Sequence, residues 1–177
     1  MSKYSIVPFS IFLVFILGIQ MAVAQQMNVL NWEKLPELPA VSGQSDNYGV
    51  AGAFSGIHNG ALIVAGGANF PEPRWESNKE WHSDIWVLPL EEEDKNWINA
   101  GNLNHPVAYG SSVMTEYGLL CIGGNSRDSV YREVFLLQWN PEEEKITRIN
   151  LPSLPEPCAY GDAAYFDDKV YLAGGSS

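Results

Sequence analysis

The sequence predicts an all-β fold of repeated antiparallel sheets, and an internal repeat is the first observation behind this prediction. Three short apolar runs, residues 61–65, 118–122 and 169–173, are each followed by two glycines. The spacing between the glycine pairs is 57 and then 51 residues. A period of about 50 residues is typical of kelch repeats, in which each repeat forms one four-stranded blade of a β-propeller. The pairs are Gly66 and Gly67, Gly123 and Gly124, and Gly174 and Gly175.

Two further observations support the same fold. Helical periodicity is nearly absent, and the apolar runs are short and rich in β-branched and aromatic residues. The flanks of the repeats also match: a Leu-Pro-x-Leu-Pro segment occurs at 35–39 and again at 151–155. A Tyr-Gly pair precedes each apolar run, at Tyr48-Gly49, Tyr109-Gly110 and Tyr160-Gly161.

The first complete blade is expected to contain four strands. Asn59-Gly60 supplies the positive φ angles of a tight hairpin between the first two strands, so His58 is interpreted as a turn residue. The acidic run 91–94 is expected at a solvated hairpin tip. The predicted strands are 50–57, 61–65, 84–90 and 96–99.

The second blade repeats this order, with strands at 118–122, 133–137 and 145–149 and an acidic tip at 140–144. Each double glycine is expected to end its strand where the neighbouring blade packs too closely for a Cβ atom. This role is structural, and no chemistry is assigned to these glycines.

The blade count predicts an incomplete ring. Trp32 matches Trp97, so residues 25–177 are expected to hold a lone fourth strand, two complete blades and the first two strands of a third. Because a propeller closes to hide its sheet edges, we expect the chain to be the N-terminal part of a longer protein. The lone strand would then complete the last blade.

Residues 1–24 have the layout of a secretory signal peptide. Lys3 is followed by the apolar stretch 6–19 and by Ala22-Val23-Ala24, a cleavage site of the A-x-A type. We expect cleavage after Ala24, a periplasmic or secreted product, and no stable membrane anchor once the peptide is removed.

Charge and cysteine content exclude several functions. The formal net charge is −11 and no basic patch occurs, which disfavours nucleic-acid binding and favours solubility. Cys121 and Cys158 are interpreted as small buried thiols, with a disulfide between them as the alternative in an exported chain. No metal-binding cysteine framework occurs, and no metal or cofactor is signalled.

The segments 49–57 and 62–70 resemble the N-acetylneuraminate epimerase (sialic acid mutarotase) family, as do 108–112 and 119–124. The resemblance covers roughly residues 31–137. It implies a periplasmic six-bladed kelch propeller. In familiar members these two blades come last, whereas here they come first, an order that resembles the cyclically permuted branch of the family.

The resemblance also implies an activity, the interconversion of the α and β anomers of N-acetylneuraminate by general acid–base ring opening, without cofactor or metal. The family's proposed catalytic Glu and Arg lie in a Gly-Glu-(four residues)-Arg-like segment of the blade before Gly-Val-Ala-Gly. In a permuted chain that segment is expected beyond residue 177, so the catalytic residues of this chain stay unknown and the fragment alone is expected to be inactive.

Candidate substrate-binding residues come from loops expected on one face of the propeller. The longest, residues 68–83, is rich in charged and aromatic side chains, and the loop 43–48 is expected beside it. Arg74 is the candidate for a bidentate clamp on the sugar carboxylate. A solvated surface loop is the alternative for each residue. The candidates are Arg74, Glu72, Glu76, Asn69, Asp46, Asn47 and His82, with Arg127 and Asp128 as weaker ones and His105 as a surface residue.

Two other functions fit the same residues. One is a non-catalytic kelch module that binds a glycan or a protein through this loop face, and the other is a mutarotase or epimerase for a different sugar. A Glu and an Arg on the loops of the missing blades would favour the enzyme. The residues leave the oligomeric state open.

Overall fold

The computed structural model describes residues 30–177. The chain divides into Met1–Lys34 and Leu35–Ser177, and the second unit contains every strand of the described residues. The expected signal peptide lies outside the described range. No described segment forms a helix long and apolar enough to cross a membrane.

The first complete blade is a four-stranded antiparallel sheet in the order β1-β2-β5-β6. Asn59 and Gly60 have φ angles of 45° and 73°, which confirms the predicted tight hairpin. The innermost strand, predicted over residues 50–57, begins only at Phe54. Among residues 50–53, Ala51 forms an isolated bridge to Ala68 and belongs to no strand. The strands are β1 (Phe54–His58), β2 (Ala61–Ala65), β5 (Asp84–Pro89) and β6 (Ile98–Asn102).

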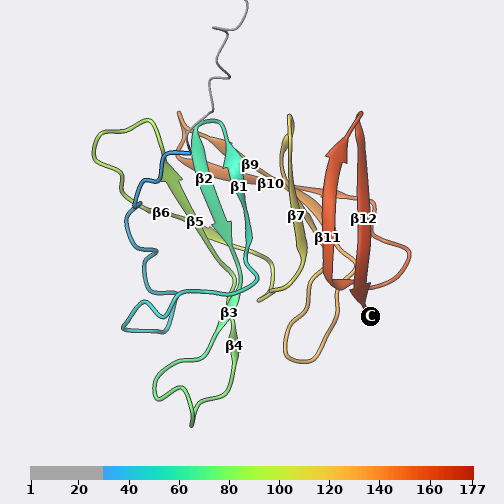
Figure 1. Ribbon diagram of the computed structural model, residues 1–177, viewed down its shortest axis with the longest axis horizontal. Coiled ribbons are helices and arrows are strands. Elements are labelled where there is room, and N and C mark those ends of the chain that lie inside the picture. Colours follow the sequence, from blue (N-terminus) through green and yellow to red (C-terminus); the bar gives the residue numbers. More distant parts are fainter. Residues whose placement is uncertain (1–29) are drawn as a thin grey trace, which may run out of the picture. The chain divides into compact units, whose positions relative to one another are not determined.

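The second blade repeats the arrangement in the order β7-β8-β9-β10, and a two-stranded sheet, β11-β12, follows it. The innermost strands of the three sheets succeed one another in Figure 1 as β1, β7 and β11. This all-β succession of sheets confirms the predicted kelch-type propeller fold, of which the chain holds part. The strands are β7 (Ser111–Thr115), β8 (Gly118–Ile122), β9 (Val134–Asn140), β10 (Lys145–Leu151), β11 (Ala159–Phe166) and β12 (Lys169–Ser176).

The glycine pairs of the first two blades end their strands as predicted. The N–H of Gly67 donates to the carbonyl of Val107 at 2.8 Å, and the N–H of Gly124 donates to the carbonyl of Cys158 at 2.8 Å. Both carbonyls belong to the segment that leads into the next sheet, so the strand ends where its backbone pairs outside its own sheet.

The third glycine pair departs from the prediction. Gly174 and Gly175 lie inside β12, and Gly174 pairs with Gly161 of β11. The ladder with β11 runs through this glycine pair to Ser176, which is paired with Ala159.

The lone strand predicted around Trp32 is also not formed, since residues 30–40 belong to no strand. A strand is stabilised by the hydrogen bonds of a neighbour, and none of the described strands takes that place. Its pairing with a further blade stays a prediction.

The core lies between the sheets. Phe54 of β1 and Phe135 of β9 meet edge to face, with ring centroids 5.7 Å apart and an angle of 84° between planes. A second, smaller cluster joins the second sheet to the third through Leu120, Ile122 and Leu136, packed against Leu172. Burial of these faces supplies the main driving force for stacking the blades.

Cys121 and Cys158 are both free thiols, so the disulfide alternative is not formed. Cys121 is fully buried in the core between the first two sheets, and burial raises the pKa of its thiol well above the ordinary value. It acts there as a small apolar side chain, as predicted.

A backbone link joins three residues at the start of the innermost strands: Gly52 and Tyr109 precede β1 and β7, and Tyr160 is the second residue of β11. The carbonyl of Gly52 accepts the N–H of Tyr109 at 2.7 Å, and the carbonyl of Tyr109 accepts the N–H of Tyr160 at 2.7 Å. All three have left-handed backbones, with φ of 65°, 59° and 61°. Gly52, and not Tyr48, is therefore the structural equivalent of Tyr109 and Tyr160, which corrects the match made from the Tyr-Gly pairs.

Substitution of the inter-blade glycines tests this architecture. A Cβ added at Gly123 would collide with the backbone carbonyl oxygen of Cys158, whereas one added at Gly49 would meet nothing within 4 Å. Both residues have positive φ. We expect Gly123→Ala to lower the free energy of unfolding by about 2–5 kcal/mol, the sum of backbone strain and overpacking.

Gly49→Ala is the matched control, since its φ of 68° is close to the 62° of Gly123 and the change carries only the backbone cost of about 1–2 kcal/mol. Urea denaturation of both variants measures the difference. Equal losses for the two would contradict close packing of the second and third sheets at Gly123.

Candidate functional site

Two loops of the first blade meet at one end of its sheet. The loop that precedes β1 and the loop between β2 and β5 are joined by Asn69, whose side chain is 8% exposed. The Asn69 amide donates to the carbonyl of Gly49 and to the Gln44 side chain, both at 2.9 Å. This confirms the prediction that the two loops lie on the same face.

A small hairpin at the base of the longer loop was not predicted from the sequence. It consists of β3 (Ala68–Asn69) and β4 (Glu80–Trp81), and it extends below the first sheet in Figure 1. The hairpin brings both ends of the loop back to the sheet, so that residues 70–79 project from a fixed base. Trp81 donates its indole N–H to Asn125 at 3.2 Å, which ties the hairpin to the second blade.

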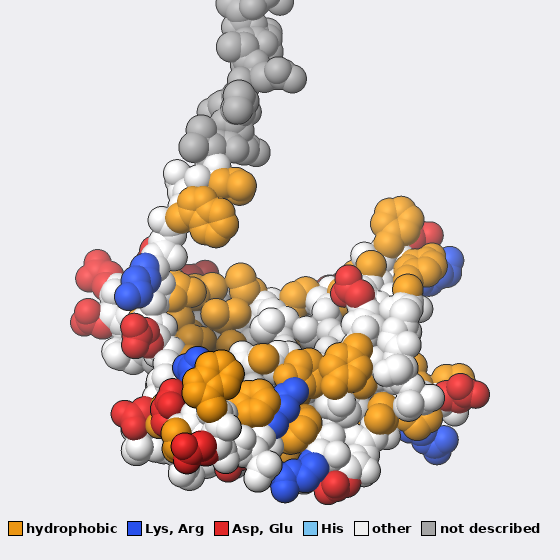
Figure 2. All heavy atoms as spheres, turned by 60° about the horizontal axis from the view of Figure 1, so that its bottom comes forward, with side chains coloured by type: hydrophobic (Ala, Val, Ile, Leu, Met, Phe, Trp, Pro, Cys, Tyr) orange, Lys and Arg blue, Asp and Glu red, His pale blue; other side chains and the backbone are white. Residues whose placement is uncertain are grey.

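The first of two clefts at this end, here named the tyrosine cleft, has a volume of about 350 Å³. Cationic and aromatic side chains gather around it, and Figure 2 shows Lys and Arg side chains among hydrophobic ones on this face. Its walls come from the first blade, with Tyr109 contributed by the second. The lining residues that carry polar side chains are Tyr48, Asn69, Arg74, Lys79 and Tyr109.

Lys79 occupies the centre of an aromatic cluster beside this cleft. Its ammonium lies 4.1 Å from the centroid of the Tyr109 ring and 5.1 Å from that of Trp81. The Tyr109 ring in turn stacks on Tyr160 with centroids 5.0 Å apart and planes inclined by 28°. Asn125 donates its amide to the Tyr160 hydroxyl at 2.9 Å while accepting from Trp81, so a single side chain fixes two of the rings.

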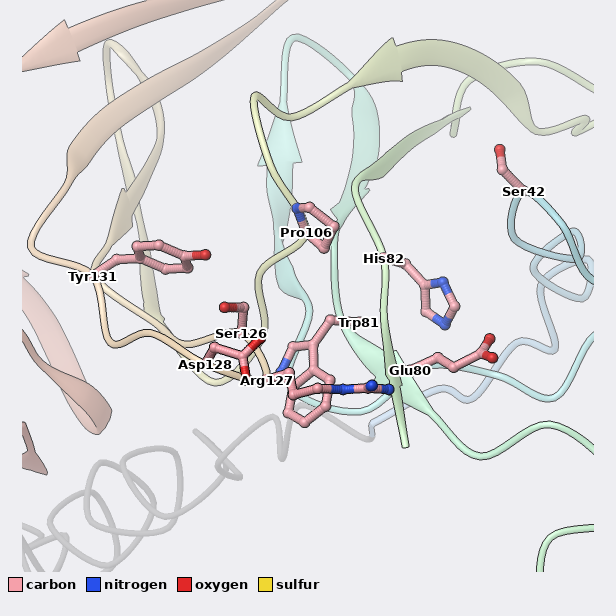
Figure 3. A pocket seen from close by; sticks show the side chains of 9 residues that line it. All are labelled: Ser42, Glu80, Trp81, His82, Pro106, Ser126, Arg127, Asp128 and Tyr131. Carbon is pink, nitrogen blue, oxygen red and sulfur yellow. The ribbon is translucent and has the colours of Figure 1, made fainter. Parts of the chain in front are cut away.

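The second cleft, here named the histidine cleft, is larger, with a volume of about 530 Å³. In Figure 3 the Arg127 side chain reaches from the second blade toward β4, and its guanidinium donates to the carbonyl of Lys79 at 3.3 Å. The cleft is lined by Ser42, Glu80, Trp81, His82, Pro106, Ser126, Arg127, Asp128 and Tyr131.

His82 lines this cleft but its ring is buried and bonded. Its Nε2 atom lies 2.8 Å from Oδ1 of Asn69. The Asn69 amide nitrogen faces the Gly49 carbonyl, which only accepts, so Oδ1 faces the histidine and Nε2 carries the proton. Burial lowers the pKa of His82, and the carboxylates of Asp84 and Glu80 oppose that shift. His82 is therefore a neutral donor that orients Asn69.

The structure brings together some of the predicted site residues and separates others. Asn69 and His82 bond directly, and Arg74 forms an ion pair with Glu72, with Nε and Oε1 3.1 Å apart. Glu76 is exposed on the same loop. Asp46 and Asn47 bond within their own loop, to the Ser45 hydroxyl at 2.7 Å and to the Gly49 N–H at 2.8 Å.

Sequence reasoning did not place Lys79, Tyr109, Tyr160 and Asn125 in the site. Lys79 lies in the loop that was singled out, and the two tyrosines belong to the repeated Tyr-Gly pairs. The repeated Tyr-Gly pairs were interpreted only as a feature of the blade fold. The stacking of the rings across neighbouring sheets depends on how the blades pack, which local sequence does not encode.

Antiparallel sheets that follow one another along the chain, are joined at glycine pairs and carry polar clefts at one end define part of a kelch-type β-propeller. A family model described as N-acetylneuraminate epimerase matches residues 19–147. The chain belongs to the N-acetylneuraminate epimerase family.

Individual relatives agree with this assignment. The N-acetylneuraminate epimerase of Brucella melitensis is 37% identical over 122 residues, which cover 62% of this chain and 30% of that protein. The protein of the same name from Yersinia pestis is 37% identical over 112 residues, covering 57% of this chain and 28% of the relative. The chain thus spans about 30% of the length of the curated relatives that it matches.

A solved structure, titled "Structure of YjhT", superimposes with a TM-score of 0.56 over 80% of this chain and 36% of that one. The sequences are 18% identical, so this likeness supports the fold alone.

The buried histidine gives the fold a pH dependence. Because the folded state lowers the pKa of His82 below its ordinary value of 6.5, the unfolded state binds more protons between those two values. The free energy of unfolding is therefore expected to fall as pH drops through that window and to be fully retained above it. Urea denaturation at a series of pH values below 7 measures the slope.

His82→Gln removes the titrating group and keeps a side-chain amide donor, so its slope in this window should be shallower. His58, whose pKa is also lowered by burial and whose Nδ1 accepts the Trp139 N–H at 3.0 Å, leaves a residual slope. Identical slopes for the wild type and His82→Gln would contradict the assignment.

Proposed function

We propose that the protein containing these blades is an exported sugar isomerase that interconverts the α and β anomers of N-acetylneuraminate. Membership of the N-acetylneuraminate epimerase family, over residues 19–147, is the observation that carries the proposal. The matched relatives bear that enzyme's name, and the described blades add a cleft in which cationic and aromatic side chains suit an acidic sugar.

The reaction needs only proton transfers. A base takes the proton from the anomeric hydroxyl, an acid protonates the ring oxygen, and the bond between that oxygen and the anomeric carbon breaks to give the open-chain keto acid. Rotation about the adjacent bond and the reverse transfers close the ring on the other face, with no net change in atoms or electrons. Positioned acid and base groups typically contribute about 10²–10⁴-fold to such a step.

The described residues contribute binding to this scheme. The half-buried ring of Tyr48 suits the apolar face of a sugar ring, and a cation of the cleft suits its carboxylate. The acid and the base are assigned to blades outside this chain, in keeping with the family's Glu and Arg segment.

Anomer exchange measures the proposed activity. The full-length protein is added to freshly dissolved sialic acid of a single anomer, and proton NMR follows the approach to the equilibrium mixture. We expect acceleration of about 10²-fold or more over the spontaneous rate. Heat-denatured protein is the control. Tight binding of the sugar without accelerated exchange would favour a glycan-binding module, and absence of both would remove the proposal.

Export makes a separate prediction. Residues 1–24 have the composition of a cleavable signal, so the mature protein is expected to begin at Gln25. N-terminal sequencing of the protein recovered from the periplasmic fraction checks this. Ala24→Leu, which spoils the small-residue cleavage site, should leave an unprocessed form in the membrane fraction. A mature protein that still begins at Met1 would contradict export through a cleaved signal.

A further inference from the structure

We propose that Lys79 binds the substrate carboxylate, held in position by Tyr109, and that Arg74 does not. This inference rests on the proposed function, and it names the residue that sets the preference of the tyrosine cleft for an acidic sugar. Four features lead to it: how the charges of the two cations are balanced, the fixed position of Lys79, the left-handed backbone of Tyr109, and the acidity of the whole chain.

The two cations of the cleft differ in how their charge is balanced. Arg74 is paired with Glu72 through its side chain, and its backbone N–H also bonds Glu72 at 3.2 Å. An anion that used Arg74 would first have to compete with that carboxylate. For Lys79, no carboxylate within 4.0 Å is found among residues 30–177, and its neighbours are two aromatic rings. A ring face attracts an ammonium without cancelling its charge, so Lys79 keeps a full charge and N–H donors for a ligand.

The position of Lys79 is fixed from several sides. Its backbone carbonyl accepts the Arg127 guanidinium, and the next residue begins β4. Its ammonium lies near Tyr109 and Trp81, whose rings are fixed by stacking on Tyr160 and by Asn125. A cation that is ordered before binding loses less conformational entropy on binding than a free surface lysine does.

The tyrosines adopt a costly backbone conformation at this point. Tyr109 and Tyr160 have φ of 59° and 61°, whereas the equivalent residue of the first blade is glycine. A left-handed conformation strains the backbone of a non-glycine residue, and such residues are concentrated at functional sites. Here it places the Tyr109 ring beside the ammonium of Lys79, where the ring holds that ammonium at the cleft.

The substrate of the proposed reaction carries a carboxylate, which the ammonium of Lys79 can bind. The chain has a net charge of −11, so its long-range field repels an anion. A local cation must offset that repulsion within the cleft. In sialic acid the carboxylate is attached directly to the anomeric carbon, so an ammonium that holds the carboxylate also positions the reacting centre.

The test compares an acid with its neutral counterpart. Isothermal titration calorimetry with the full-length protein measures the affinity for N-acetylneuraminate and for its methyl ester. The wild type is expected to prefer the acid by about tenfold, the value of one charge-assisted hydrogen bond. Lys79→Met, which keeps the apolar stem, should lose that preference while its affinity for the ester stays within about twofold of the wild type.

Three further variants act as controls. Lys79→Arg should retain most of the preference for the acid, which separates loss of charge from misfolding. Arg74→Gln should keep the wild-type preference. Lys145→Met, at the exposed first residue of β10, should change neither affinity.

The outcomes are distinguishable. Loss of the acid preference in Arg74→Gln, or its retention in Lys79→Met, would overturn the assignment to Lys79 while leaving the proposed function in place if the wild type still accelerates anomer exchange. A wild type that neither binds the sugar nor accelerates exchange would overturn the proposed function and this inference together.

Discussion

The backbone hydrogen bonds from Gly67 to Val107 and from Gly124 to Cys158 join each sheet to the segment that opens the next. In the first junction, Val107 accepts the N–H of Gly67 and donates its own N–H to the carbonyl of His82. The second junction repeats this at Cys158, between Gly124 and Tyr131. Glycine is required because the backbone has positive φ and because a Cβ at Gly66 or Gly123 would collide with the carbonyl of Val107 or Cys158.

The binding face depends on these junctions. Directly after Gly67 the chain forms β3, and Asn69 then ties together the loops that form the tyrosine and histidine clefts. The same close approach sets the separation of neighbouring sheets, which brings Tyr109 to Lys79 and Tyr160 to Tyr109. A change at a glycine junction would therefore alter the site as well as stability, although no glycine of these pairs contacts a ligand in the proposed scheme.

The repeat made most of the fold predictable. Strands β2, β5, β8, β9 and β10 were expected close to their observed bounds, because each combines an apolar run with a turn signal of its own. The β3–β4 hairpin was not expected, because two paired residues on each side leave no periodicity to detect. The candidate site was predictable to the level of the loop: Asn69 and Arg74 do border the tyrosine cleft. The pairing of Arg74 with Glu72, and the burial of His82, depend on side-chain positions that no spacing reveals.

By itself, the sequence determined the architecture, because alternating apolar runs, Asn-Gly turns and double glycines act over a few residues and recur with a fixed period. It also determined the acidic character of the chain and, through its similarity, the family. Only the tertiary structure decided which cation of the cleft keeps an unbalanced charge, which equivalent residues carry the aromatic stack, and how far β12 extends. The aromatic stack beside Lys79 joins residues 30 and 51 positions apart, from Lys79 to Tyr109 and from Tyr109 to Tyr160, and such contacts form only when the sheets pack against one another.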